Sequence, residues 1–237
     1  MKDVDFAKKL MDIAENWKTL YVMGCFGAPL TIANKSRYLS EQSYNRRAER
    51  KAKINAARSD VFGFDCVCLV KGVLWGWDGD KNDRYGGAVY ASGGVPDVGT
   101  EGMIGLCKGV STDFSALSVG ELLWMQGHVG VYVGNGKCVE CTPSWKDGVQ
   151  VTDVLNIVSG STVGHRWTKH GKLPFVQYTD AGLSRAEEIA RYIDVLRKVG
   201  IISEPSKWQV KAEVDGDIYH LLRKTADKFK KCTINRT

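Results

Sequence analysis

The sequence has little proline and no long apolar segment. Only 5 of its 237 residues are proline, and no run of about 18 or more apolar residues occurs, which excludes a transmembrane helix. The first ten residues, MKDVDFAKKL, carry acids and lysines where a secretory signal peptide would be apolar. We therefore expect a protein that is made in the cytoplasm without a signal peptide and does not insert into a membrane.

The composition excludes several further classes of protein. With 43% hydrophobic and 25% charged residues, the chain is not a disordered protein, a collagen or a coiled coil. Its length predicts one large domain, or one domain with a small appendage. A net charge of +6 permits contact with an anionic polymer such as nucleic acid or teichoic acid but demands neither. Solvated lysines are the simpler interpretation, and no nucleic-acid partner is expected.

Seven cysteines, an odd number, argue against a disulfide framework and for reduced thiols. Cys66 with Cys68 and Cys138 with Cys141 could together supply four zinc ligands. However, Cys-x-Cys is not the usual spacing of a zinc knuckle, and both pairs lie among apolar residues. Small buried side chains are therefore the favoured interpretation, with no metal site and no cofactor.

Hydrophobic periodicity predicts an α+β fold. Apolar residues at helical spacing predict a helix over 3–19 and a buried helix over 65–77, with a short helix near 100–108. Residues 20–34 are expected to form an irregular loop. From residue 119 the period changes to two, and strands are expected at 121–125, 128–133, 137–142, 149–152 and 173–178.

Two further segments stand out by their charge or composition. Residues 35–60 hold eight basic and three acidic side chains, which indicate an anion-binding patch or, more simply, a solvated helix face. Composition changes near residue 180, and helices are expected at 185–199 and 215–231. We therefore divide the chain into a domain over 1–178 and a helical appendage over 180–237.

The segment Phe64-Asp65-Cys66 opens the predicted buried helix. A thiol in the first turn of a helix lies near the partial positive charge of the N-terminal amides, which lowers its pKa and favours the nucleophilic thiolate. A buried structural cysteine is the alternative.

A second chemical signal lies in the hairpin HVGVYVGNGKCVECT. Strand alternation predicts that His128, Gly130 and Glu140 share one face, while the valines and Cys141 share the other. A three-residue loop places Gly130 opposite Glu140, so that His128 and Glu140 are diagonal neighbours about 7–8 Å apart at Cα. A histidine held by a third polar group is half of a nucleophilic triad. A solvated strand histidine is the alternative.

These segments resemble the NlpC family of cell-wall cysteine peptidases. The resemblance covers about residues 15–178 and is closest to the phage and prophage lysin branch. The segments that carry it are YVMGCFGAPLT (21–31), FDCVCLVKGVLWGW (64–77), VGE (119–121), HVGVYVGNG (128–136), VECTPSW (139–145) and RWTKHGKLP (166–174). It implies a papain-like peptidase core with N-terminal helices and an antiparallel sheet.

The resemblance also implies roles for particular residues. Cys66 would be the nucleophile, His128 the base and Glu140 the third member, a position where many members of the family carry histidine. Tyr21 would border the nucleophile, and Asp65 would contact the substrate amine. Val67 stands where the family often has serine, which leaves an amidase-like cut open beside the endopeptidase cut.

The function expected from this resemblance is hydrolysis of an amide bond in the stem peptide of peptidoglycan. Trp145, directly after the hairpin, is the candidate wall of a substrate cleft. Delivery to the wall would follow release through a membrane hole made by another protein. Residues 180–237 would bind the wall or form a homo-oligomer. A thiol amidase or acyltransferase of the same fold and a non-catalytic zinc or binding module are the alternatives.

Overall fold

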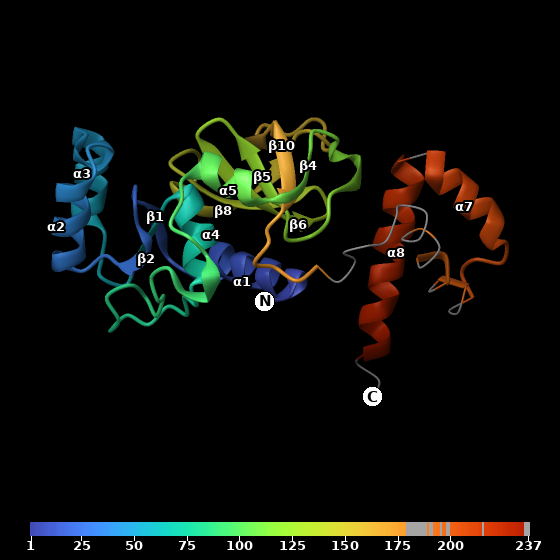
Figure 1. Ribbon diagram of the computed structural model, residues 1–237, viewed down its shortest axis with the longest axis horizontal. Coiled ribbons are helices and arrows are strands. Elements are labelled where there is room, and N and C mark those ends of the chain that lie inside the picture. The colour runs from blue at the N-terminus through green and yellow to red at the C-terminus, as the bar shows by residue number, and fades with distance from the viewer. Residues whose placement is uncertain (179–188, 190–191, 195, 198–199, 215, 235–237) are drawn as a thin grey trace. The chain divides into compact units, whose positions relative to one another are not determined.

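The computed structural model describes residues 1–178, 189, 192–194, 196–197, 200–214 and 216–234 (Figure 1). The chain divides into two units, Met1–Thr179 and Asp180–Thr237. The first unit is mixed α+β, with helices and two sheets, and the described part of the second is helical. No helix in these described ranges has the length and apolar character needed to cross a membrane.

The predicted helices of the first unit are present, with shorter bounds. Helix α1 (Asp3–Asn16) buries Phe6, Leu10 and Ile13 on one face, and α5 spans Thr100–Leu106. Helix α4 (Cys66–Leu74) is buried at every residue from Cys66 to Val73. It begins at Asp65 because the carboxylate of Asp65 accepts a hydrogen bond from the N–H of Cys68 at 2.7 Å.

The expected irregular loop over 20–34 is wrong in part, because it contains regular elements. Strands β1 (Thr19–Tyr21), β2 (Phe26–Pro29) and β3 (Phe62–Phe64) form a small sheet in the order β1-β3-β2. Helix α2 (Ile32–Glu41) then starts at its N-cap Thr31, and α3 spans Ala48–Ala56. Strands of three or four residues are too short to show a period of two.

Both the backbone conformation and the packing around position 27 require glycine there. Its φ is +107°, and a Cβ there would lie 2.2 Å from the ring of Trp77. The same ring donates a hydrogen bond to the carbonyl of Gly27 at 2.8 Å. The glycine that suggested a loop therefore lets a buried tryptophan approach the backbone of β2.

The second sheet has seven strands in the order β4-β10-β5-β6-β7-β8-β9. Their neighbours are antiparallel except for β8 and β9, which are parallel. Helices α1 and α4 pack against strands β6, β7 and β8. The strands are β4 (Lys108–Ser111), β5 (Leu122–Met125), β6 (His128–Gly134), β7 (Lys137–Thr142), β8 (Gly148–Val154), β9 (Gly164–His165) and β10 (Lys169–Lys172).

Four of the five predicted strands are confirmed, and the fifth, at 173–178, is wrong. The strand lies earlier, at β10, and the following segment turns instead of pairing. Its apolar residues Leu173 and Val176 are buried in the core from these turns, and a single bridge joins Gln177 to Lys2. The apolar residues of this segment are there because they are buried, and a turn that contains Pro174 can bury them without forming a strand.

The predicted alternation along the hairpin is confirmed. Val129, Val131, Val139 and Cys141 join the core that includes α1 and α4. On the opposite face Tyr132, Cys138 and Trp167 belong to a separate buried cluster. Because Cys138 and Cys141 point to opposite faces of β7, they cannot meet at one zinc ion, and the four-cysteine alternative is wrong.

In the second unit, helix α7 spans Pro205–Val214 and α8 spans Gly216–Ile234. Helix α8 confirms the prediction of a helix over 215–231, whereas α7 was not predicted. The helix expected at 185–199 lies largely outside the described residues. The unit has its own buried cluster, formed by Ile189, Tyr192, Ile193, Leu196, Ile202, Ala212, Tyr219, Leu222 and Ala226.

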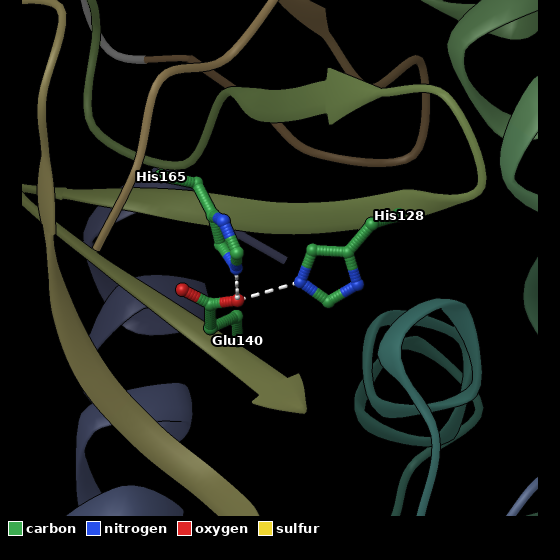
Figure 2. Close-up of side chains that lie close together, drawn as sticks. All are labelled: His128, Glu140 and His165. Carbon is green, nitrogen blue, oxygen red and sulfur yellow. Dashed lines mark hydrogen bonds and ion pairs between the residues drawn. The ribbon is translucent and has the colours of Figure 1, made fainter. Parts of the chain in front are cut away.

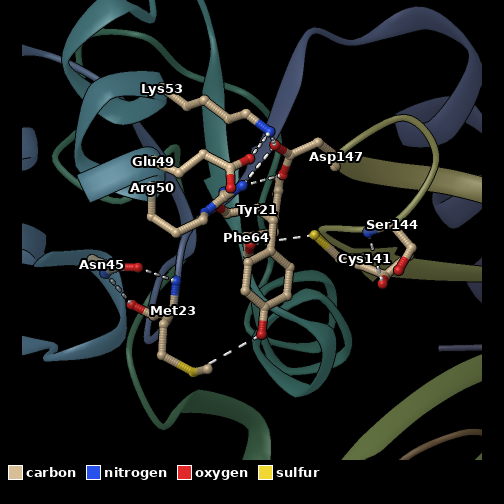
Figure 3. Close-up of polar contacts among 12 residues, drawn as sticks. Tyr21, Met23, Asn45, Glu49, Arg50, Lys53, Phe64, Cys141, Ser144 and Asp147 are labelled. Atoms are coloured by element: carbon tan, nitrogen blue, oxygen red, sulfur yellow. Dashed lines mark hydrogen bonds and ion pairs between the residues drawn. The ribbon is translucent and has the colours of Figure 1, made fainter. Parts of the chain in front are cut away.

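A buried ion pair ties α3 to the loop between β7 and β8 (Figure 3). Nη1 of Arg50 lies 2.7 and 2.6 Å from the two carboxylate oxygens of Asp147, and Nζ of Lys53 lies 2.9 Å from one of them. Nη2 of Arg50 also donates to the carbonyl of Tyr21. Arg50 is only 6% exposed, so the expectation of a solvated helix face is wrong at this position.

We expect Arg50→Ala to lower the free energy of unfolding of the full chain by about 3 kcal/mol, because it leaves the carboxylate of Asp147 poorly compensated in a partly buried site. Lys51→Ala, which changes an exposed residue of the same helix, should cost less than about 0.5 kcal/mol. Urea denaturation of the three proteins measures this difference. Equal stability of both variants would contradict an internal role for Arg50.

Candidate active site

The hairpin brings His128 and Glu140 together as its register requires. Gly130 is paired with Glu140, which confirms the predicted register. Nε2 of His128 lies 2.6 Å from Oε2 of Glu140 (Figure 2). The ring of His128 is therefore held through Nε2, and Figure 2 shows its second nitrogen, Nδ1, on the side of the ring away from the carboxylate.

Glu140 is fully buried, with 0% of its surface exposed. Its other oxygen, Oε1, accepts a hydrogen bond from the hydroxyl of Thr152 on β8. Burial by itself raises the pKa of Glu140, but the contacts with His128 and His165 outweigh it and lower the pKa to about 2. Glu140 is thus a carboxylate at neutral pH, although none of its surface is exposed to solvent.

His165 is a member of this group that sequence reasoning missed. Its Nε2 lies 3.2 Å from Oε2 of Glu140, the same oxygen that His128 contacts. Glu140 raises the pKa of His165, against the opposing effect of burial. His165 comes from β9, a strand of two residues, so no periodic pattern marks its position. Its only signal is that it directly precedes the segment RWTKHGKLP.

Aromatic rings enclose the histidine pair. Trp167 stacks on His128 with ring centroids 5.5 Å apart and planes at 14°. A Cβ at position 130 would lie 3.1 Å from this indole, so Gly130 provides the space that Trp167 fills. Trp145, the predicted cleft wall, is 45% exposed, and its ring lies 5.2 Å from that of His165. The open side of the group is therefore bordered by an exposed indole.

Cys66 is the first residue of α4, and its side chain is buried, at 6% exposure. Burial raises the pKa of its thiol to about 12, with a further contribution from Asp65. The prediction of a lowered pKa is therefore wrong. The N–H groups of Val129, Val67 and Cys66 lower the pKa, as a helix start should, but desolvation outweighs them. The thiol at rest carries its proton.

The position of Cys66 relies on the packing of α4 against β6. The N–H of Val129, the residue after His128, lies close enough to the sulfur to stabilise a thiolate. Among the described residues, the N–H groups of Cys66 and Val67 have no other hydrogen-bond acceptor. The start of α4 thus offers two amide donors beside the sulfur, and β6, the strand that begins with His128, offers a third, the N–H of Val129.

Tyr21 and Asp65 both lie near the thiol. Burial raises the pKa of the Tyr21 phenol, and Cys66 and Asp65 add to the effect. The hydroxyl lies 4.0 Å from the sulfur of Met23 (Figure 3). Asp65 is 4% exposed and uses both oxygens internally, accepting from the N–H of Cys68 and from that of Gly24, each at 2.7 Å. Its capping role is clear, and a contact with a substrate amine stays a prediction.

A second buried histidine–carboxylate pair lies elsewhere in the sheet. Nδ1 of His170 on β10 lies 2.5 Å from Glu121, and its Nε2 lies 2.8 Å from the carbonyl of Asp113. Both nitrogens face acceptors, so the ring is held as an imidazolium, and Glu121 and Asp113 raise its pKa although burial opposes them. With both nitrogens occupied, His170 serves the structure.

No protein-family model matches this chain, and no curated protein is significantly similar to it. Membership of the NlpC family therefore stays a prediction.

The two histidine–carboxylate pairs provide matched tests of each other. Because Glu140 raises the pKa of His165, Glu140→Gln should lower that pKa toward the ordinary value of about 6.5. Glu121→Gln should lower the pKa of His170 and leave that of His165 unchanged. Titration of the histidine ring protons by NMR measures both values. The same downward shift of His165 in both variants would contradict a specific contact with Glu140.

Proposed function

We propose that this chain is a thiol hydrolase that cleaves an amide bond of the stem peptide of peptidoglycan. Cys66 is the nucleophile, His128 the base and Glu140 the residue that orients the base. The observation that carries the proposal is the 2.6 Å contact between His128 and a buried, ionised Glu140, on the strand that packs against the helix of Cys66. A helix that begins with a cysteine and packs on antiparallel strands that carry the base also fits a papain-like core.

The protonation of the thiol and the position of the two ring nitrogens fit these roles. Nε2 of His128 holds the ring against Glu140, which leaves Nδ1 as the nitrogen that can accept the proton of Cys66. Because burial keeps the thiol protonated, thiolate and imidazolium form together, and the carboxylate stabilises the imidazolium. The pair therefore forms when a substrate is in place to use it.

The reaction then follows acyl transfer through sulfur. The thiolate attacks the amide carbon, and the N–H groups at the start of α4 stabilise the oxyanion. His128 gives its proton to the leaving amine, which leaves an acyl group on Cys66. Water, deprotonated by His128, releases the acid and restores the thiol.

The proposed substrate is based on the resemblance to the peptidase family and on the exposed side chain next to the site. The exposed indole of Trp145 beside His165 fits a wall of a substrate cleft. Val67, buried directly after the nucleophile, leaves open whether the cut is that of an endopeptidase or an amidase. A thiol acyltransferase of the same fold is the second candidate, since it would use the same acyl-enzyme with an acceptor other than water.

The proposed substrate lies outside the cell membrane, so the protein must reach the wall. Action on the wall would follow release through a membrane hole made by another protein. Residues 180–237 would contact the anionic wall or a second copy of the chain. Six basic residues lie between 223 and 236, which fits the first role: Arg223, Lys224, Lys228, Lys230, Lys231 and Arg236.

Cys66→Ala should abolish the hydrolysis of purified muropeptides, because no other group at the site can form the acyl-enzyme. The matched control is Cys107→Ala, which removes a partly buried thiol of the same unit. The products are read by mass spectrometry, and circular dichroism shows that both variants are folded. Full activity of Cys66→Ala would contradict the assignment, and loss of activity in Cys107→Ala alone would place the reactive thiol elsewhere.

Glu140→Gln should lower kcat by about tenfold or more, in the range of base-assisted steps. The amide has no charge to stabilise imidazolium, and its NH2 group can donate to Nε2, which favours the ring tautomer with the proton on Nδ1. That tautomer cannot accept a proton from Cys66. Initial rates between pH 6 and 8 measure the effect. An unchanged rate over that range would reduce Glu140 to a strand residue.

A further inference from the structure

Three potential metal ligands converge at the candidate active site. Nε2 of His128, Nε2 of His165 and an oxygen of Glu140 all lie within 4.8 Å of one another. In the part of the chain that the structure describes, this is the one such group of three histidine, cysteine or acidic side chains. We propose that it binds a divalent transition metal of the zinc class, and that the bound metal switches off the thiol centre.

The two distances from the carboxylate oxygen to the histidine nitrogens are close to those of a tetrahedral zinc site. Zinc–nitrogen and zinc–oxygen bonds of about 2.0–2.1 Å at tetrahedral angles place ligand atoms about 3.3 Å apart. The 3.2 Å between His165 and Glu140 already has this length, while the 2.6 Å between His128 and Glu140 must open by roughly 0.7 Å. Two imidazoles and one carboxylate leave the fourth position for water or another ligand.

The surroundings hold these ligands in place. Thr152 fixes Oε1 of Glu140, which leaves Oε2 for a metal, and Trp167 stacks on the ring of His128. Neighbours of this kind orient the side chains that bind the metal and raise the affinity for it. Nε2 of His165 is buried and, among the described residues, makes no hydrogen bond of good geometry although it faces the carboxylate. A metal ion would satisfy this nitrogen.

The chemical consequence follows from the ring nitrogen that the metal takes. A metal on Nε2 of His128 requires the neutral ring to carry its proton on Nδ1. That nitrogen then donates and cannot accept the proton of Cys66, so the base is blocked although its ring stays in position. This inhibitory step depends on the proposed function, whereas metal binding itself does not.

Binding is tested on the full chain, freed of metal with a chelator, by calorimetric titration with Zn²⁺ and by the visible absorption of Co²⁺. Wild type and Cys66→Ala should both bind one equivalent with a tetrahedral Co²⁺ spectrum, because the sulfur is not a required ligand. His165→Gln should weaken binding at least tenfold. His220→Gln removes the one histidine outside the first unit and should leave the affinity unchanged.

The same proteins test inhibition. One equivalent of Zn²⁺ should lower the wild-type rate of muropeptide hydrolysis at least tenfold, EDTA should restore it, and EDTA alone should cause no loss. In His165→Gln, inhibition should require at least tenfold more Zn²⁺, whatever its basal rate.

Two outcomes would overturn the proposed metal site. They are equal affinity in wild type and His165→Gln, and loss of binding in Cys66→Ala alone, which would place the ion on the thiol. One-to-one binding to wild type and Cys66→Ala, lost in His165→Gln, supports the site even if wild type hydrolyses no muropeptide, in which case the proposed function fails and the metal site stands.

Discussion

The structure of the site depends on one buried carboxylate. A charge with no exposed surface is costly unless cations or strong donors compensate it, and Glu140 has two histidines and one hydroxyl for this purpose. Strand β7 lies between β6 and β8, so the two neighbouring strands supply His128 and Thr152, and β9 supplies His165. Four adjacent strands of the sheet therefore supply the carboxylate of Glu140 and its three partners.

The protonation of Cys66, the proposed nucleophile, depends on the opposite balance of effects. The start of α4 offers amide donors that favour a thiolate, yet desolvation and Asp65 keep the proton on Cys66. Asp65 is needed because it caps the helix and binds Gly24, so the helix start that positions the sulfur also carries a charge that opposes its ionisation. The proposed reaction therefore requires the proton of Cys66 to move to a base, which makes the position of His128 decisive for the proposal.

The sequence pattern predicted those parts of the site that are determined by residues close together in the sequence. The hairpin register was predictable because alternation and the Gly-Asn-Gly turn are both local, and so was the helix that begins at Cys66. His165, the stacking of Trp167 and the ion pair of Arg50 were not, because each depends on contacts between residues far apart in the sequence. The short strands of residues 20–34 and the turn over 173–178 were misread for a related reason, since burial there comes from tertiary packing and not from a regular period.

The two histidines on Glu140 differ in what they can contribute. His128 lies on β6, the strand that packs against the helix of Cys66, while His165 lies on β9, next to the exposed Trp145. A proton relay needs one imidazole on the carboxylate, and the second adds positive charge that lowers the pKa of Glu140 further. The same second imidazole completes a set of three ligands. The proposed proton chemistry therefore uses only one of the two imidazoles, and the second is the additional ligand that would make the site sensitive to a metal ion.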